Sequence, residues 1–283
     1  MGSPCELLCE AASSRAAGKL AAIVAAEAWR IEDKLSRYIR GNVIDQINSA
    51  GGKPVVVDAE TQHLLDFAET LHELSDAAFD ITSGVLRRIW NFDGSDNIPS
   101  KLTVAELLPL VGWKNVTWQS PVLTLPSGME IDLGGIGKEY AVDRAILELK
   151  SISDIPCLVN FGGDLAVTGP PRKQKTWTVG IETAAGAATA KRIELRSGAL
   201  ATSGDARRYL LKDGVRYGHV IDPRTGWPVR DAASSITVAA DTCTQAGMLS
   251  TMAMLKGPLA EMFLDSQDEH YWCRREQPNL EIT

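Results

Sequence analysis

Apolar residues in the first third of the chain recur at the three- and four-residue spacing of an amphipathic helix. Two runs show this pattern and predict helices over residues 16–35 and 59–74. The apolar positions are Leu20, Ile23, Val24, Ala28 and Ile31 in the first run, and Leu64, Leu65, Phe67, Ala68 and Leu71 in the second. Around them we expect a short strand over residues 1–9, a turn with a short helix over 36–48, and a strand over 55–57.

The pattern changes after residues 92–99, whose sequence FDGSDNIP is rich in turn formers and predicts a loop. Short apolar runs then predict strands over 116–118, 122–125, 157–160, 177–181, 193–195, 200–203, 218–221 and 236–239. Helices are expected over 138–149 and 244–255, and a hairpin tip or surface loop over 184–190. Strands mixed with a few helices, without regular alternation, indicate an α+β fold. We expect one domain over 1–283, helix-rich over about 1–98 and strand-rich over about 99–283.

Composition and charge narrow the class of protein. The 283 residues are 45% hydrophobic and 23% charged, which is ordinary for a globular protein. A net charge of −7 disfavours nucleic-acid binding, and no apolar run reaches the length of about 18 to 20 residues that a transmembrane helix needs. Without a signal-peptide pattern at residues 1–9, we expect a cytoplasmic protein, or a periplasmic one if an export signal has been removed.

Five cysteines occur without a CxxC spacing. Cys5 and Cys9 could pair or bind a metal, but scattered buried thiols are the preferred interpretation. We therefore predict neither a disulfide framework nor a zinc site.

A glycine-rich segment, IDLGGIGKEYAVD at residues 131–143, carries the strongest chemical signal. We expect a strand that ends at Asp132, three glycines, and a helix that begins near Lys138. Glycines let the backbone approach a ligand closely, a helix N-terminus favours an anion, and Lys138 adds positive charge. The spacing fits neither a dinucleotide-binding GxGxxG motif nor a P-loop. A tight turn without a ligand explains the glycines equally well.

Other polar clusters are weaker when each is considered alone. Residues 159–164 (VNFGGD) and 201–205 (ATSGD) are typical of turns. His219, expected within a strand, is either a general acid/base or a structural histidine, and Arg224 either holds a turn or binds phosphate. Ser250 and Thr251 offer hydroxyls to a hard cation or to the helix backbone. Together these clusters suggest backbone and oxygen ligands that converge on a phosphate–metal site.

The order of these motifs resembles the ApbE family, the FAD:protein FMN transferases. The resemblance extends from Met1 to about Gly257, and its combination of motifs is specific although no single piece is. The matching pieces are Met1-Gly2, Ser36-Arg37-Tyr38 with Ile47-Asn48, Ala78 to Thr82 with Trp90-Asn91-Phe92, Asp132 to Lys138, Asn160 to Asp164, Thr202 to Asp205, and His219 to Gly226.

This resemblance implies an α+β fold with T-fold-like mixed sheets and packed helices, FAD in a cleft, and Mg²⁺ at its pyrophosphate. It implies transfer of FMN to a Thr or Ser hydroxyl of a target flavoprotein, with release of AMP. Some members of the family instead hydrolyse FAD, and others mainly hold it. By position, Tyr38 resembles the residue that stacks on the flavin, and His219 resembles the catalytic residue. The other matches are Met1, Ala78, Phe79, Asp80, Asp132, Lys138 and Val220 for FAD, and Gly135, Ser250 and Thr251 for the metal.

Two positions depart from the family pattern. Gly247 stands where the family has a metal-binding Asp, four residues before Thr251, and Glu139 stands where the family usually has Gly. These changes predict weaker metal binding and turnover, and Gly247→Asp is expected to raise metal dependence and turnover. A metal-dependent transferase remains the preferred hypothesis because His219, Lys138 and Thr251 are present. The alternatives are an FAD-binding protein or FAD pyrophosphatase with a weakened metal site, or an enzyme of the same fold that acts on another nucleotide.

Overall fold

A six-stranded antiparallel sheet lies at the centre of the computed structural model, which describes residues 3–181, 191–204 and 208–275. Its strand order is β1-β5-β6-β9-β14-β15, and every neighbouring pair is antiparallel. The strands are β1 (Cys5–Cys9), β5 (Cys157–Phe161), β6 (Asp164–Val167), β9 (Ala199–Gly204), β14 (Ser235–Ala240) and β15 (His270–Arg274). Side chains alternate between the two faces, so Val159 and Leu158 belong to different hydrophobic clusters.

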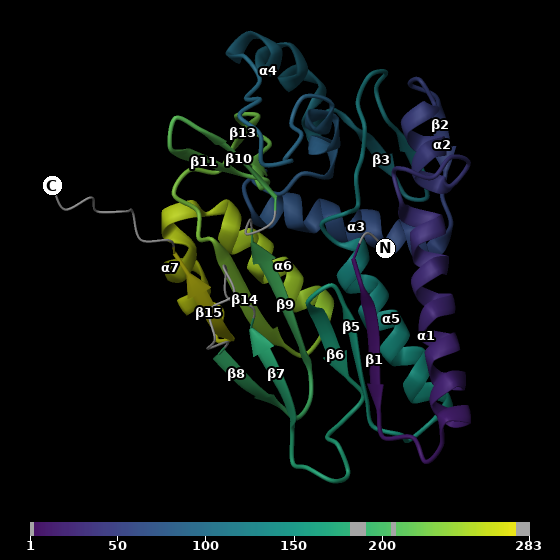
Figure 1. Cartoon of the computed structure of the whole chain (residues 1–283). Helices are drawn as coiled ribbons and strands as arrows, with labels where there is room; N and C mark the ends of the chain where they lie inside the picture. Colours follow the sequence, from purple (N-terminus) through teal and green to yellow (C-terminus); the bar gives the residue numbers. More distant parts are fainter. Residues whose placement is uncertain (1–2, 182–190, 205–207, 276–283) are drawn as a thin grey trace, which may run out of the picture.

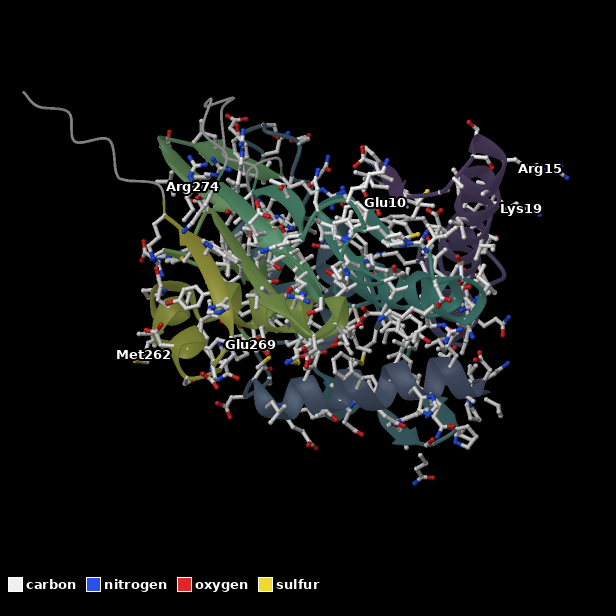
Figure 2. The ribbon with its side chains drawn as sticks, turned by 90° about the horizontal axis from the view of Figure 1, so that it is seen from below. Glu10, Arg15, Lys19, Met262, Glu269 and Arg274 are labelled. Atoms are coloured by element: carbon white, nitrogen blue, oxygen red, sulfur yellow. The ribbon has the colours of Figure 1, made fainter. Side chains whose placement is uncertain are left out.

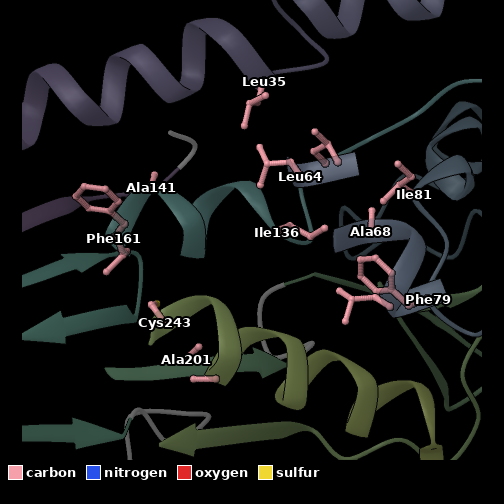
Figure 3. Close-up of a cluster of buried hydrophobic side chains, with 14 of the residues drawn as sticks. Leu35, Leu64, Ala68, Phe79, Ile81, Ile136, Ala141, Phe161, Ala201 and Cys243 are labelled. Atoms are coloured by element: carbon pink, nitrogen blue, oxygen red, sulfur yellow. The ribbon is translucent and has the colours of Figure 1, made fainter. Parts of the chain in front are cut away.

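Two helices, α5 (Gly137–Ile152) and α6 (Cys243–Leu255), cover one face of this sheet, and α1 (Ser14–Leu35) lies beside α5 (Figure 1). Phe161 and Ala201 point from the sheet toward these helices (Figure 3). On the opposite face, the hairpin of β7 (Trp177–Ile181) and β8 (Lys191–Leu195) packs its partly buried apolar residues against the sheet. The sheet is therefore buried on both faces.

The start of α6 is fixed by a carboxylate from α5. Asp143 accepts hydrogen bonds from the backbone N–H groups of Cys243 and Thr244, at 2.8 Å each, and from the Thr244 hydroxyl at 2.6 Å. A carboxylate at a helix N-terminus satisfies free N–H groups and is favoured by the helix dipole. This contact sets α6 against the first turns of α5, where the candidate site lies.

Most of the N-terminal half lies outside the six-stranded sheet and the helices that cover it. Its elements are α2 (Val43–Ser49), β2 (Pro54–Val56), α3 (Ala59–Leu74), the 3-10 helix η1 (Ile81–Arg88), α4 (Lys101–Leu107), the 3-10 helices η2 (Leu108–Leu110) and η3 (Trp113–Asn115), β3 (Thr117–Gln119) and β4 (Val122–Thr124). β2, β4 and β3 form a small sheet. Three buried residues of α3, Leu64, Leu65 and Ala68, join the main core, so both halves of the chain contribute to one hydrophobic cluster (Figure 3).

Two small antiparallel pairs lie near η1 and α4, and a second hydrophobic cluster joins them to these helices. Trp90 is buried in this cluster, and its indole N–H donates to the Gly226 carbonyl at 2.9 Å. The pairs are β10 (Tyr209–Lys212) with β11 (Val215–Gly218), and β12 (Ile221–Asp222) with β13 (Trp227–Pro228). The chain then ends its described part with η5 (Gly257–Leu259), α7 (Ala260–Asp265) and β15. Figure 2 places Met262 of α7 and Arg15 of α1 at opposite ends of the molecule.

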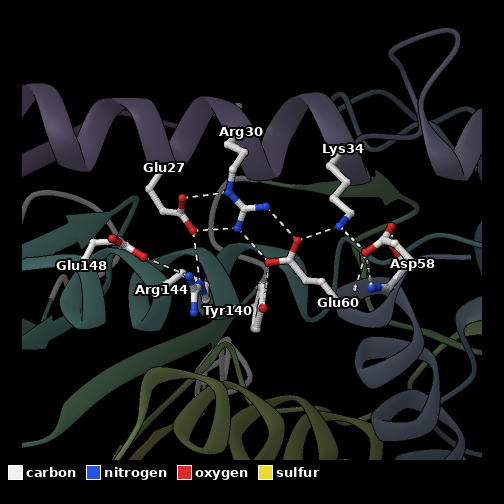
Figure 4. A network of polar contacts seen from close by, with 9 residues as sticks. Glu27, Arg30, Lys34, Asp58, Glu60, Tyr140, Arg144 and Glu148 are labelled. Atoms are coloured by element: carbon white, nitrogen blue, oxygen red, sulfur yellow. Dashed lines mark hydrogen bonds and ion pairs between the residues drawn. The ribbon is translucent and has the colours of Figure 1, made fainter. Parts of the chain in front are cut away.

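A polar network joins α1, α3 and α5 at the surface of the core (Figure 4). The guanidinium of Arg30 donates two hydrogen bonds to Glu27 and two to Glu60, all at 2.7 to 2.8 Å. Glu60 also accepts from Lys34 at 2.7 Å and from the Tyr140 hydroxyl at 2.9 Å. Because donors from two helices meet one carboxylate of a third, Glu60 links the three helices.

The structure confirms the α+β class and the helices expected over 16–35, 59–74, 138–149 and 244–255, as well as the loop over 92–99. The expected strand ending at Asp132 is wrong. The backbone of Ile131 instead exchanges two hydrogen bonds with the side-chain amide of Asn48, at 2.8 and 3.0 Å, and Asp132 donates to the Ile81 carbonyl. This segment is extended, but a side chain from α2 occupies the place of a partner strand.

The expected strand over 218–221 is also wrong, because β11 ends at Gly218 and β12 begins at Ile221. His219 and Val220 therefore lie in a connection between two strand pairs. The sequence patterns did not predict α4, α7, β6, β10 or β15 as separate elements. Residues 184–190, the expected hairpin tip, fall outside the described residues.

All five cysteines are free thiols, and Cys157 and Cys243 are buried. In the parts of the chain that the structure describes, no helix combines the length and apolarity needed to cross a membrane.

Candidate functional site

The first part of the site is an ion pair between α5 and β6. Asp164 is 1% exposed, and one of its carboxylate oxygens accepts a hydrogen bond from the Thr202 backbone N–H at 2.9 Å. The other oxygen pairs with the Lys138 ammonium. Burial lowers the pKa of Lys138, but the charges of Asp164 and Glu139 outweigh this effect and hold the pKa above its usual value. Lys138 is therefore positively charged, and its side chain is partly exposed.

A tight turn delivers Asp164 to this position. Gly162 and Gly163 have φ values of 65° and 101°, which glycine adopts without strain, and Gly163 donates its N–H to the side chain of Asn160 at 2.8 Å. The turn predicted for VNFGGD is thus confirmed. Its glycines also place a buried carboxylate beside the start of α5.

The glycine-rich loop before α5 approaches two other segments closely. Ile136 takes the N-cap position of α5 and offers no side-chain hydrogen bond. Gly134 and Gly135 are exposed, and Gly134 donates its N–H to Asp132 at 2.8 Å. A Cβ at Gly135 would lie 3.4 Å from the Phe79 ring. The loop therefore lies against the segment that begins η1, and two of the predicted site residues are neighbours there.

Glu139 lies one residue further along α5 than Lys138 and is 8% exposed. Its side chain points toward α6: a Cβ built on Gly247 would lie 2.5 Å from Glu139 Cγ and 3.2 Å from Oε1. Burial, and then the nearby charge of Asp164, raise the pKa of Glu139 to about 8. Glu139 therefore fills the space over Gly247.

Three hydroxyls meet next to these carboxylates. Ser203 Oγ on β9 lies 2.9 Å from Ser250 Oγ and 2.9 Å from Thr251 Oγ1 on α6. Ser250 is fully buried and also donates to the Gly247 carbonyl at 3.0 Å. Ser250 thus bonds back to its own helix, which is one of the two alternatives for this hydroxyl, and cation binding by Ser250 and Thr251 stays a prediction.

His219 lies close enough to Lys138 for its charge to affect the imidazole. Burial first, and then the charges of Arg87 and Arg208, lower the pKa of His219 to about 4, and Lys138 adds to this effect. The ring packs edge-to-face with Phe92 at a centroid distance of 6.3 Å. Its Nδ1 atom is buried and has no hydrogen-bond partner among the described residues. His219 is therefore neutral near pH 7 and has a free ring nitrogen.

Asp132 and Tyr38 are connected through Arg37. Arg37 donates to the Gly84 carbonyl at 2.7 Å and lies 3.4 Å from Asp132, while its guanidinium stands 5.7 Å from the Tyr38 ring centroid. A Cβ at Gly84 would approach Asp132 Cβ at 2.9 Å, so only glycine allows η1 this close to the loop. Tyr38 is 82% exposed, which leaves its ring open to an aromatic ligand.

Asp80, predicted to contact FAD, has its carboxylate occupied by hydrogen bonds within the protein. It is 7% exposed, and its carboxylate accepts bonds from the Thr82 N–H and hydroxyl and from the Trp113 N–H, at 2.6 to 2.8 Å. These bonds commit its oxygens to holding η1 and η3. Ala78 and Phe79 beside it are buried in the main core, with Phe79 nearest to Gly135.

A hollow of about 650 Å³, which Asp80 also lines, lies between α4, the 3-10 helices η2 and η3, and the turn after β12. Arg224 lines it, but its guanidinium pairs with Asp222 in its own turn at 2.8 Å. This contact favours the turn-holding interpretation of Arg224. The hollow is separate from the cluster around Glu139, none of whose residues line it.

Three further positions from the sequence motifs are Val220, Met1 and Asp205. Val220 packs against the main core, and its carbonyl accepts from the Val229 N–H at 2.9 Å. Met1 and Asp205 fall outside the residues that the structure describes. The structure brings Lys138, Ser250 and Thr251 into one neighbourhood with Asp164 and Glu139.

Comparison with known proteins places the chain in one family. The model of the ApbE family matches residues 1–272. The chain belongs to the ApbE family. The FAD:protein FMN transferases of Vibrio cholerae and Haemophilus influenzae are each 30% identical to it, over 80% and 81% of this chain and 70% and 67% of their own lengths.

Solved structures of ApbE proteins share the fold. The ApbE protein of Thermotoga maritima superposes with a TM-score of 0.86 at 33% identity, covering 96% of this chain and 91% of that one. The flavin transferase ApbE of Vibrio cholerae gives a TM-score of 0.81 at 25% identity, over 95% and 94% of the two chains.

The residues of this ApbE-family chain fit a hard divalent cation. Within residues 3–181, 191–204 and 208–275, no group of three or more His, Cys, Asp and Glu side chains could hold a metal. Mg²⁺ instead uses one or two carboxylates with neutral oxygens and retained waters. Glu139 Oε2 is buried without a hydrogen-bond partner in the described structure, and Glu139 lies against Gly247, whose carbonyl accepts a hydrogen bond from the Ser250 hydroxyl.

Sequence reasoning did not identify two important residues of this ApbE-family site. Asp164 was interpreted as part of a turn, and Glu139 as an unfavourable change. The available signal was spacing: Asp164 follows two turn glycines at the start of a strand, and Glu139 directly follows Lys138. Only the packing of α5 on α6 shows where the side chains of these residues point.

Proposed function

We propose that this chain is an FAD:protein FMN transferase, which moves FMN from FAD to a Thr or Ser hydroxyl of a target flavoprotein and releases AMP. The observation that carries the proposal is the buried Nδ1 of His219, which has no hydrogen-bond partner among the described residues and lies within the electrostatic reach of Lys138. Family membership and the names of the relatives support the choice of flavin chemistry.

In the proposed reaction, the acceptor hydroxyl oxygen attacks the phosphorus of the FMN half of FAD. A P–O bond to the acceptor forms, the bond from that phosphorus to the bridging oxygen breaks, and AMP leaves with the bridging oxygen. His219 accepts the hydroxyl proton at Nδ1, which its neutral state allows. Phosphoryl transfer depends mainly on positioning and on neutralising oxygen charge.

The other residues have roles in binding and orientation. Lys138 is a fixed positive charge for a phosphate oxygen, and the exposed ring of Tyr38 offers a stacking surface for the isoalloxazine. Glu139, Ser250 and Thr251, with the Gly135 carbonyl, are the groups that would hold Mg²⁺. When bound, this ion would neutralise charge on the pyrophosphate.

The test combines product analysis with one substitution. We expect the purified protein, incubated with FAD, Mg²⁺ and a candidate flavoprotein acceptor, to release AMP and to add FMN to the acceptor, as mass spectrometry would show. His219→Ala should slow transfer by about 10²- to 10⁴-fold, the usual contribution of a positioned acid or base. His270→Ala is the matched control, since His270 is exposed on β15.

Two outcomes would replace the proposal. Release of AMP without a modified acceptor, across several flavoprotein acceptors, would favour an FAD pyrophosphatase. Tight binding of FAD without AMP in any divalent metal would favour an FAD-binding protein.

A further inference from the structure

The side chain of Glu139 occupies the space that a side chain at residue 247 would need. A Cβ on Gly247 would lie 2.5 Å from Glu139 Cγ, 3.1 Å from Cδ and 3.2 Å from Oε1. Atoms that are not bonded do not approach to 2.5 Å without one of them moving. Residue 247 is glycine in this chain, and the carboxyl group nearest to it comes from α5.

This carboxyl group is buried and incompletely satisfied. Glu139 is 8% exposed, and no hydrogen-bond donor in the described part of the chain reaches its Oε2 atom. A buried polar oxygen without a partner costs free energy, so an unpartnered oxygen in this position is open to a ligand. Protein side chains alone do not supply that ligand here.

The surrounding groups indicate the kind of ligand. Two carboxyl groups, Glu139 and Asp164, lie near a single ammonium, that of Lys138, and this ammonium pairs with Asp164. The Ser250 hydroxyl bonds to the Gly247 carbonyl directly beneath Glu139, and Ser203 links Ser250 to Thr251. One free carboxylate oxygen beside neutral oxygens is a donor set for a small hard cation.

We propose that Glu139 supplies the acidic ligand of the divalent cation in this chain, from α5, in place of a carboxylate at residue 247 on α6. The proposal rests on the proposed function, because the cation would serve the same pyrophosphate. Gly247 and Glu139 are then complementary. The glycine leaves room for the Glu139 side chain, and Glu139 supplies the carboxyl group from the facing helix.

This arrangement corrects the hypothesis that Gly247→Asp alone restores a better metal site. An aspartate at 247 would place its Cβ against Glu139 Cγ, and its carboxylate would add a like charge to the same buried space. We expect Gly247→Asp alone to lower both the thermal stability and the cation affinity. Removing the Glu139 side chain at the same time opens the space for the aspartate.

The test measures cation binding directly with Mn²⁺, a probe that prefers the same oxygen ligands as Mg²⁺ and is visible by electron paramagnetic resonance. The full-length chain is titrated with Mn²⁺ in the absence of FAD, and free Mn²⁺ is quantified. We expect Glu139→Gln, which keeps shape and loses charge, to weaken binding by at least about tenfold. The double variant Glu139→Ala with Gly247→Asp should restore affinity to within about threefold of the parent chain.

Glu148→Gln is the matched control, because Glu148 lies on the same helix but its side chain is 42% exposed and pairs with Arg144. It should bind Mn²⁺ as the parent does, and circular dichroism should show that all variants are folded. Parent-like binding by Glu139→Gln, a folded double variant that does not regain affinity, or a parent chain that binds no Mn²⁺ would each overturn the proposal. If the Mn²⁺ results hold but no FMN reaches an acceptor, the transferase proposal fails and the ligand assignment stands.

Discussion

The pKa of His219 depends on its neighbours rather than on the residue itself. Burial and the positive charges of Arg87, Arg208 and Lys138 all disfavour the imidazolium, while a hydrogen bond with the backbone of Arg208 only partly opposes them. The result, a pKa of about 4 against an ordinary 6.5, keeps the ring neutral over the whole physiological range.

This shift predicts the pH dependence of the proposed transfer. A base works in its neutral form, so activity that depends on His219 is lost only as the pH falls through its folded pKa, near 4. We therefore expect kcat/KM for FMN transfer to show no decrease attributable to His219 between pH 8 and about 5.5. An acid limb centred near 6.5, present in the parent and absent from the residual activity of His219→Ala, would contradict the prediction.

At the scale of elements, helix contacts decide which side chains meet. Asp143 of α5 holds the first N–H groups of α6, and this contact places Gly247 opposite Glu139. On the other side of α5, Glu60 of α3 joins α1 through Arg30 and Lys34, and α5 through Tyr140 (Figure 4). The α5 helix is therefore fixed on both sides before any ligand binds.

The Glu60 network predicts a pH-dependent contribution to stability. Hydrogen bonds from Arg30 are the main cause that lowers the pKa of Glu60, with Lys34 and Tyr140 acting in the same direction against burial. A lowered folded pKa stabilises the protein above the unfolded value, which is near 4.3, and this contribution is lost as the pH falls toward the folded value. We expect Glu60→Gln to reduce the free energy of unfolding by about 1 to 2 kcal/mol at pH 7.

Chemical denaturation at pH 7 and at about pH 3.5 would measure this effect, and the difference between the two proteins should shrink at the lower pH. Glu73→Gln, at an exposed position on the same helix α3, is the control and should change little at either pH. A Glu60→Gln effect that grows on acidification would contradict the sign of the predicted linkage.

At the scale of the whole molecule, one hydrophobic cluster draws on both the helix-rich and the strand-rich parts of the chain. It contains Leu65 of α3, Ile136 of the glycine-rich loop, Phe161 of β5 and Met254 of α6. Apolar residues of each part are buried against those of the other part. Neither part therefore keeps its core when the other unfolds.

We predict that the two parts unfold together. Phe161 is fully buried, so Phe161→Ala should lower the free energy of unfolding by about 3 to 5 kcal/mol. Tryptophan fluorescence, which includes Trp29 and Trp90 of the N-terminal part, and far-ultraviolet circular dichroism should shift to the same new midpoint. Leu102→Ala, at a position that is 77% exposed, is the control. Separate midpoints for the two probes would show that the parts unfold independently.

Periodic and local features of the chain could be predicted without tertiary information. The spacing of Leu20, Val24, Ala28 and Ile31 requires a helix with one apolar face, and that helix is present. The turn glycines of residues 162–163 and the loop over 92–99 depend on the conformational freedom of a few neighbouring residues, and both were predicted. The family resemblance, carried by the order of the motifs, is also confirmed.

Features that depend on distant partners could not be predicted in this way. Ile131 looked like the end of a strand, but the amide of Asn48, 83 residues away in sequence, takes the place of a strand partner. His219 looked like a strand residue, but its strand pairing stops one residue earlier. Local sequence fixes the preferences of the backbone, whereas the partner of each hydrogen bond depends on which segments pack together.

Glu139 and Gly247 illustrate this division most clearly. The sequence by itself determined that residue 247 is glycine and that residue 139, 108 residues earlier, is glutamate. Only the packing of α5 against α6 decided that both residues share the same space, because a side chain's direction follows from its helix and its neighbours from the tertiary fold.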